Sequence, residues 1–153
     1  VDLATELANA FVAHRRVHHV VYDDVRPALE RLRGRYRMAL LTNGASDLQR
    51  EKIAGAGLAP CFDEVLVAAD IGISNPDPRL FRAKLTRLRI EPQAAVMLGD
   101  SQSRDIQGAA AVGMRTIWVN RTGLPRRNGV TCDLEVANLT ECVEWITARA
   151  PMR

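Results

Sequence analysis

The sequence lacks a long apolar run. No stretch approaches the ~20 consecutive apolar residues that span a bilayer, so we expect no membrane segment. The first twenty positions carry acidic and arginine residues without a continuous apolar core, so we expect no signal peptide. Aromatic residues make up only 5% of the chain and form no series among the scattered basic residues, which argues against a nucleic-acid partner.

Cysteine is also scarce. Cys61, Cys132 and Cys142 are odd in number and form no CxxC pattern, which predicts reduced thiols in a cytoplasmic protein. The rest of the composition is ordinary: 153 residues, 47% hydrophobic, 25% charged, with a net charge of +3. These values are typical of one soluble globular domain that is long enough to bury a core.

Apolar runs alternate with helical periodicity along the chain. We expect strands at residues 37–42, 64–68, 94–98 and 115–119. We expect helices at residues 2–19, from Pro27 to near Gly34, from Ser46 to Gly55–Gly57, and at 79–88, 103–112 and 140–149. Asp24 is a candidate cap for the second helix, and Ser46 to Gln49 match a capping box for the third. This alternation predicts an α/β fold, a Rossmann-like parallel sheet with helices on both faces.

Acidic side chains follow one of the buried strands. Asp100 ends the strand at 94–98, and Asp105 lies one turn into the next helix. Carboxylate oxygens are the ligands that Mg²⁺ prefers, and Asp105 is suited to hold a metal-bound water or to orient Asp100. The alternative is that both residues only cap and solubilise a helix start.

Small polar groups end a second buried strand. Thr42 and Asn43 supply a hydroxyl and an amide, and the backbone N–H groups of Gly44 and Ala45 precede a helix, which is a natural anion site. The alternative is an ordinary strand-to-helix turn. Ligands of open α/β sheets bind at the carboxyl ends of strands, so the two strand ends together predict a phosphate and metal site.

Three segments resemble motifs of the haloacid dehalogenase-like hydrolase superfamily, particularly its small-molecule phosphatases with a helical cap. They are Leu40-Leu41-Thr42-Asn43-Gly44, Gly72-Ile73-Ser74-Asn75-Pro76-Asp77-Pro78, and Gly99-Asp100-Ser101 through Asp105 to Gly113-Met114. The resemblance implies a Mg²⁺ cofactor and an aspartate that attacks a phosphomonoester to form an aspartyl-phosphate. It implies that Thr42, Asn43 and Gly44 bind the phosphoryl group, and that Asp100 ligates Mg²⁺ with Asp105 in support.

The superfamily's opening motif, an apolar strand ending in Asp-x-Asp-x-Thr, is absent. Asp23 and Asp24 are adjacent, so an extended chain points them to opposite sides, and no threonine follows. We therefore expect the nucleophile upstream of Val1. Residues 1–22 resemble the last cap helix with its return linker, and residues 23–153 resemble a core without its first strand, which in the family lies between the strands of Thr42 and Asp100.

A second departure is Asn75, which stands where the superfamily has a catalytic lysine. An amide carries no charge, and losing one such electrostatic group commonly costs ~10²–10³ in rate. Arg104 or Lys84 are candidates to replace the charge, although a solvated surface position is the simpler interpretation of both. Arg121, Arg126 and Arg127 are interpreted as part of a solvated loop.

A histidine cluster lies on the first predicted helix. His14 and His18 are four residues apart and could face one metal, but no third ligand is evident. A polar helix face is the simpler interpretation of this cluster, and attraction of an anionic substrate is the alternative.

These observations predict a Mg²⁺-dependent phosphatase acting on a small phosphorylated metabolite, with negligible turnover by the present chain alone. One alternative is a catalytically impaired binding or regulatory module, favoured by Asn75 and the absent nucleophile. Another is a haloacid dehalogenase, which the pair Asp100-Ser101 disfavours. A phosphoacceptor receiver domain is a weaker idea, because its acidic cluster and late lysine are absent. Free strand edges also favour self-association.

Overall fold

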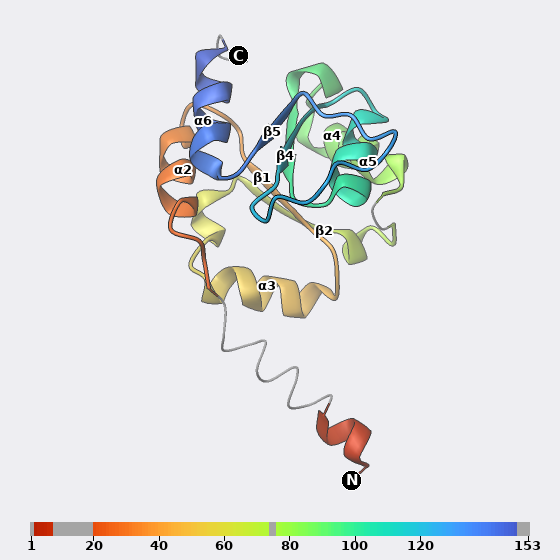
Figure 1. Cartoon of the computed structure of the whole chain (residues 1–153). Coiled ribbons are helices and arrows are strands. Elements are labelled where there is room, and N and C mark those ends of the chain that lie inside the picture. The colour runs from red at the N-terminus through yellow and green to blue at the C-terminus, as the bar shows by residue number, and fades with distance from the viewer. Residues whose placement is uncertain (1, 8–19, 74–75, 150–153) are drawn as a thin grey trace.

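A computed structural model describes residues 2–7, 20–73 and 76–149 (Figure 1). Its helices are α2 (Val25–Leu32), α3 (Ser46–Gly55), α4 (Pro78–Leu88), α5 (Gln107–Ala110) and α6 (Leu139–Ala148). Its strands are β1 (Ala39–Thr42), β2 (Glu64–Val67), β3 (Val96–Gly99), β4 (Arg115–Val119) and β5 (Leu134–Val136). Residues 3–7 are helical, as predicted, but the rest of the helix expected at 2–19, with its histidine cluster, lies outside the described residues.

The strands form two parallel sheets. In one, β1 pairs with β2, from Ala39 opposite Glu64 to Thr42 opposite Val67. In the other, the order is β3-β4-β5. The predicted α/β class is confirmed, but among the described residues β1 and β3 each pair on one side only, so the sheet is not continuous.

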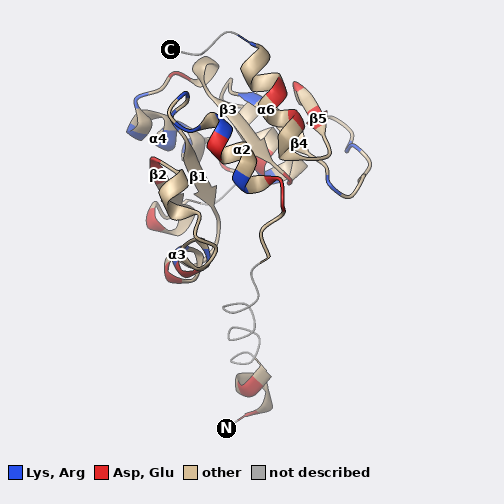
Figure 2. Ribbon diagram, turned by 90° about the vertical axis from the view of Figure 1, so that its left-hand side faces the viewer, with Lys and Arg blue, Asp and Glu red and all other residues tan. Residues whose placement is uncertain are grey.

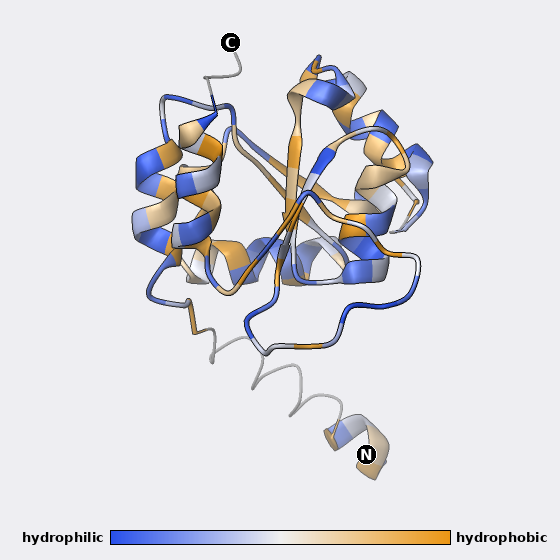
Figure 3. Cartoon of the chain, turned by 45° about the horizontal axis from the view of Figure 1, so that its top comes forward, coloured by the Kyte–Doolittle hydropathy of each residue, from blue (hydrophilic) through white to orange (hydrophobic). Residues whose placement is uncertain are grey.

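Helices cover both sides of these strands. Figures 1 and 3 show α2 and α6 together on one side, and α4 and α5 on the other. The larger apolar cluster joins α2, α6, β4 and β5 through buried residues: Ala28, Leu29, Leu32, Met38, Ile117, Val119, Val136, Cys142, Val143 and Ile146. Charged residues of both signs are interspersed along α2 and α3 in Figure 2, as on amphipathic surface helices.

Helix α4 contacts the β1–β2 sheet on one side and helix α5, which follows β3, on the other. At its C-terminal end, Arg37 just before β1 donates to the carbonyl of Leu88 (2.9 Å), and Arg87 lies 3.7 Å from Glu64, the first residue of β2. Nearer its N-terminal end, the ring of Phe81 packs so closely on Gly108 that a Cβ there would lie 2.5 Å away. Since a crossover helix runs antiparallel to its strands, the N-terminal half of α4 lies toward the strands' carboxyl ends.

Two elements differ from the sequence prediction. The helix expected at 103–112 begins one residue earlier as a π-helical turn, Gln102–Ile106, and continues as α5. The strand β5 was not predicted, because three residues are too few to show a period. Among the helices within the described ranges, none combines the length and apolar character needed to cross a membrane.

Candidate active site

The hydroxyl of Thr42, at the end of β1, is held by the helix that follows. Its Oγ1 donates to Oε1 of Gln49 across 2.8 Å. The intervening Gly44 has a φ of 110°, and a Cβ there would lie 3.0 Å from the Gln49 amide. The predicted capping box is wrong, because the N-cap of α3 is Ala45 and the Gln49 side chain turns back to the strand end instead.

Asn43 is half-buried, and its Oδ1 is a buried atom that finds no hydrogen-bond partner among the described residues. Leaving a buried amide oxygen unpaired costs about 1–3 kcal/mol, so such atoms usually have a partner. The carbonyl oxygen of an amide accepts hydrogen bonds and can bind a cation. This atom therefore indicates room for a donor or a cation beside the end of β1.

The loop after β3 is fixed from β4. The indole Nε1 of Trp118 donates to the carbonyl oxygen of Asp100 across 3.0 Å, and Trp118 is only 1% exposed. The sequence did not predict this hydrogen bond, because the pattern around Trp118 indicates only an apolar strand residue. The bond holds the Asp100 backbone, and none of the described residues is seen to hydrogen-bond to the Asp100 carboxylate.

The carboxylate of Asp105 holds the next residue of the same loop. Its Oδ2 accepts the backbone N–H of Ser101 at 3.1 Å. A Cβ on Gly99 would lie 2.5 Å from Cβ of Asp105, so only glycine lets the turn approach the strand this closely. The structure thus brings Asp100 and Asp105 together across Ser101.

A second missed residue, Gln102, ties a distant loop to this turn. Its Nε2 donates to the carbonyl of Pro125 (3.0 Å), and its Oε1 accepts the N–H of Arg127 (2.7 Å). Gln102 is buried, so both halves of its amide are satisfied by one loop. The loop at 120–133 is irregular, as predicted, but it is anchored over the Asp100 turn.

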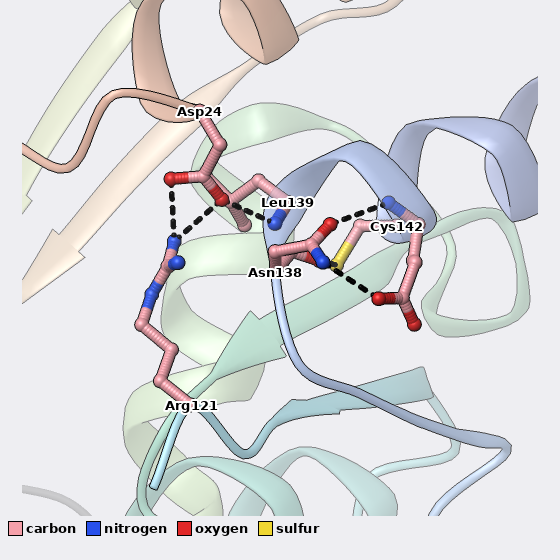
Figure 4. Close-up of polar contacts among 6 residues, drawn as sticks. Asp24, Arg121, Asn138, Leu139 and Cys142 are labelled. Carbon is pink, nitrogen blue, oxygen red and sulfur yellow. Dashed lines mark hydrogen bonds and ion pairs between the residues drawn. The ribbon is translucent and has the colours of Figure 1, made fainter.

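The carboxylate of Asp24 joins three parts of the chain (Figure 4). Both of its oxygens accept from Nη2 of Arg121, at 3.0 and 2.8 Å, and Oδ2 also accepts the N–H of Leu139 (2.7 Å). The guanidinium of Arg121 lies 4.2 Å from the Tyr22 ring centre. Asp24 precedes α2 without capping it through its side chain, and the solvated-loop interpretation of Arg121 is wrong, since its side chain is only 23% exposed.

Opposing effects act on the pKa of Asp24. Burial raises the pKa, but the hydrogen bonds from Arg121 and Leu139 and the charge of Arg121 outweigh it, leaving the pKa below 3.8. Asp24 is therefore an ionised structural anchor.

The two candidate replacements for the missing lysine charge differ in burial. Arg104 is exposed, and its Nε donates to the hydroxyl of Ser101 at 3.2 Å. Lys84 is only 4% exposed, so its interpretation as a solvated residue is wrong. The sequence held a signal for this: Lys84 lies four residues from both Leu80 and Leu88, within an apolar stripe. Asn75 itself lies outside the described residues.

The carboxylates present fit one side of a Mg²⁺ site. Asp100 and Asp105 offer the hard oxygen atoms that this ion prefers, and Asn43 adds an unpartnered buried oxygen. Across the ranges that the structure describes, no group of three or more His, Cys, Asp and Glu side chains is placed to hold a metal. Further ligands would have to come from water, substrate or another segment.

Known proteins resemble this chain over most of its length. It is 44% identical over 141 residues to a phosphoserine phosphatase of Thermus thermophilus, covering 92% of this chain and 56% of that protein. It is 35% identical over 123 residues to the N-acylneuraminate-9-phosphatase of Homo sapiens, covering 80% and 50%. The chain thus spans about half the length of these curated relatives.

Solved structures agree on the fold. The crystal structure of a HAD phosphatase from Thermococcus onnurineus matches with a TM-score of 0.75 and 39% identity, over 82% of this chain and 57% of that one. A 2-haloacid dehalogenase from Pseudomonas syringae matches with a TM-score of 0.81 and 36% identity, over 97% and 62%. A family model described as haloacid dehalogenase-like hydrolase matches residues 2–113. Together with the motifs at the ends of β1 and β3, these matches show that the chain belongs to the haloacid dehalogenase-like hydrolase family.

Proposed function

We propose that the protein is a Mg²⁺-dependent phosphatase that hydrolyses a small phosphorylated metabolite through an aspartyl-phosphate. One observation carries the proposal: Thr42 ends β1 and Asp100 directly follows β3, two strands that pair on one side only among the described residues, and the N-terminal half of α4 lies toward these strand ends. Ligands of α/β sheets bind at this position. The phosphatase relatives support the same reaction.

Each side chain has a distinct role in this proposal. Thr42 donates its hydroxyl to a phosphoryl oxygen, exchanging the partner that it now has in Gln49. The Asn43 amide and the Gly44 N–H line the same anion site. The Asp100 carboxylate holds Mg²⁺, which when bound neutralises charge on the phosphoryl oxygens. Asp105 keeps Asp100 in position through Ser101.

We propose that the nucleophilic aspartate belongs to a strand that pairs with both β1 and β3. Among the described residues, β1 and β3 each have one unpaired edge, and no residue of either strand is fully buried. Ala39–Thr42 and Val96–Gly99 are apolar enough to be interior strands of a parallel sheet. In this arrangement residues 1–22 are the end of a cap, and residues 23–153 are the core that receives the strand.

Phosphate release with and without the preceding segment tests both proposals. The present chain is expected to have negligible Mg²⁺-dependent turnover of 4-nitrophenyl phosphate or phosphoserine. The product of the reading frame extended upstream of Val1 is expected to be active, and Asp100→Asn is expected to lower its kcat by ~10²–10³. Robust activity of the present chain that Asp23→Asn abolishes would overturn the assignment of the nucleophile.

Two other functions have specific support. Asn75 in place of lysine favours a binding or regulatory module without turnover. The similarity to the Pseudomonas syringae dehalogenase favours halide release from a short 2-haloacid. The extended protein separates them: phosphate release supports the phosphatase, chloride release from 2-chloropropionate supports the dehalogenase, and ligand binding with neither product supports the module.

We also propose a cytoplasmic location and reversible self-association. Cys61, Cys132 and Cys142 are all unpaired, as suits a reducing compartment. Self-association would use the free edges of β1 and β3, which can pair with strands of another copy. Sedimentation of the present chain and of the extended protein tests this: the self-association should disappear when the edges are filled.

A further inference from the structure

Lys84 is an unusual residue in this chain. The sequence has two lysines against nineteen arginines, and one of those two lysines is in the core. Lys84 is 4% exposed, and its Nζ has no hydrogen-bond partner among the described residues. The other lysine, Lys52, lies exposed on α3. Buried ammonium groups normally have a partner, so this one indicates a partner that the described residues do not supply.

An anion is the partner that a buried ammonium group would favour most. Burial lowers the pKa of Lys84 from 10.5 to about 8, so the amine is still mostly protonated at pH 7. A positive charge therefore remains inside the protein. An arginine could not give up its proton there, whereas the Lys84 amine can, and a bound anion would favour its charged form further.

The position of Lys84 narrows the choice of anion. It lies on the buried face of α4 between Phe81, which packs on Gly108, and Leu88, which accepts from Arg37. The first contact joins α4 to α5, which follows β3, and the second joins α4 to Arg37, just before β1. Helical side chains lean toward the helix N-terminus, and the N-terminal half of α4 lies toward the strand ends of Thr42 and Asp100.

We propose that Lys84 is a phosphate-binding residue whose ammonium pairs with the phosphoryl oxyanion bound between Thr42 and Asp100. This deepens the proposed phosphatase function and rests on it. The positive charge comes from the middle of α4, while position 75 carries an uncharged asparagine. The ligand class is a phosphomonoester or its inorganic phosphate product.

The chain's two lysines make a direct test. Protein labelled with [ε-13C]lysine gives two NMR signals, and Lys52 is the internal reference. Inorganic phosphate with Mg²⁺ is expected to raise the titration midpoint of Lys84 by about one to three pH units and to leave Lys52 unchanged. A Lys84 signal that does not respond to phosphate overturns the inference.

Two variants separate this inference from the proposed function. Lys84→Met is expected to weaken phosphate binding about tenfold or more, the change that one pH unit of coupling requires, and Lys52→Met to leave it unchanged. If the extended protein hydrolyses phosphomonoesters equally well with Lys84→Met, the inference fails while the phosphatase stands. If the wild type of that protein does not turn over phosphomonoesters, the proposed function fails. The NMR titration uses the chain without any substitution, so it decides the role of Lys84 even if Lys84→Met does not fold.

Discussion

Trp118 on β4 donates its indole N–H to the carbonyl oxygen of Asp100, 3.0 Å away, one residue beyond the end of β3. In the ladder between these strands, Trp118 is opposite Gly99, so the indole passes beside the last strand residue to reach the loop. A residue that packs the core thus also fixes the backbone of the proposed metal ligand.

Trp118→Phe removes this donor and keeps an aromatic ring in the core. We expect the loss of about 0.5–1.5 kcal/mol of hydrogen bonding plus a packing cost of similar size in the free energy of unfolding. Urea denaturation measures it. Trp145→Phe is the control, since Trp145 is only partly buried and contacts the guanidinium of Arg149 instead. Equal effects of the two changes would contradict a special role for Trp118.

Arg121→Met breaks the anchor at Asp24. The pKa of Asp24 is below 3.8 in the folded protein, so the unfolded chain binds more protons at low pH. The stability from this carboxylate is therefore fully present above about pH 4, and it is lost as the pH falls through the folded-state pKa. We expect Arg121→Met to cost about 1–3 kcal/mol at pH 7 and less at pH 3.

The matched control for that anchor is Arg126→Met. Arg126 pairs with Glu135 at 2.8 Å, but its side chain is 48% exposed. Exposed ion pairs contribute about 0–1 kcal/mol, so this variant should unfold nearly as the wild type does at both pH values. A loss from Arg126→Met as large as that from Arg121→Met would show that burial is not what distinguishes the two pairs.

Gly99→Ala should disturb the turn that carries Asp105. The new Cβ would meet Cβ of Asp105 at 2.5 Å, and neither backbone can yield easily. We expect a loss of about 1–3 kcal/mol, measured by thermal denaturation, together with weaker metal binding by the extended protein. Gly55→Ala, in α3 with nothing within 4 Å of its Cβ, should instead stabilise by about 0.5–1 kcal/mol. The opposite ranking of these variants would rule out this packing argument.

Gln102→Leu should release the loop that the amide holds. The carbonyl of Pro125 and the N–H of Arg127 both lose their partner, and the peptide bonds after Arg126 and Arg127 become better trypsin sites. We expect cleavage there to accelerate several-fold, as mass spectrometry of timed digests would show. Gln107→Leu, at an exposed position of the next turn, should leave the digestion rate unchanged.

Local signals made most of the fold predictable. The observed bounds of β2, β4 and α4 are close to the predicted ones. Glycine and proline residues between the elements indicate where they begin and end. Side-chain hydrogen bonds between different elements were harder to predict. Gln49 has the spacing of a capping residue, but the Thr42 hydroxyl competes for its side chain, and no local pattern reveals which partner is closer.

Buried polar residues were the least predictable part of the candidate site. Gln102 and Arg121 each act through a segment far along the chain, so neighbouring residues do not indicate their partners. Lys84 was different, because its place within an apolar helical stripe was visible in the sequence. The position of a charged residue within an apolar stripe of a helix predicts that its side chain is buried.

The separation of β1–β2 from β3–β4–β5 affects how the molecule opens. Along a continuous ladder, backbone hydrogen bonds couple every strand to the next. Here side-chain packing couples the two sheets, through Phe81 of α4 on Gly108 of α5 and through Met38, just before β1, in the apolar cluster with β4 and β5. We therefore expect the β1–β2 half to exchange its amide protons in sub-global fluctuations that leave the other ladder intact.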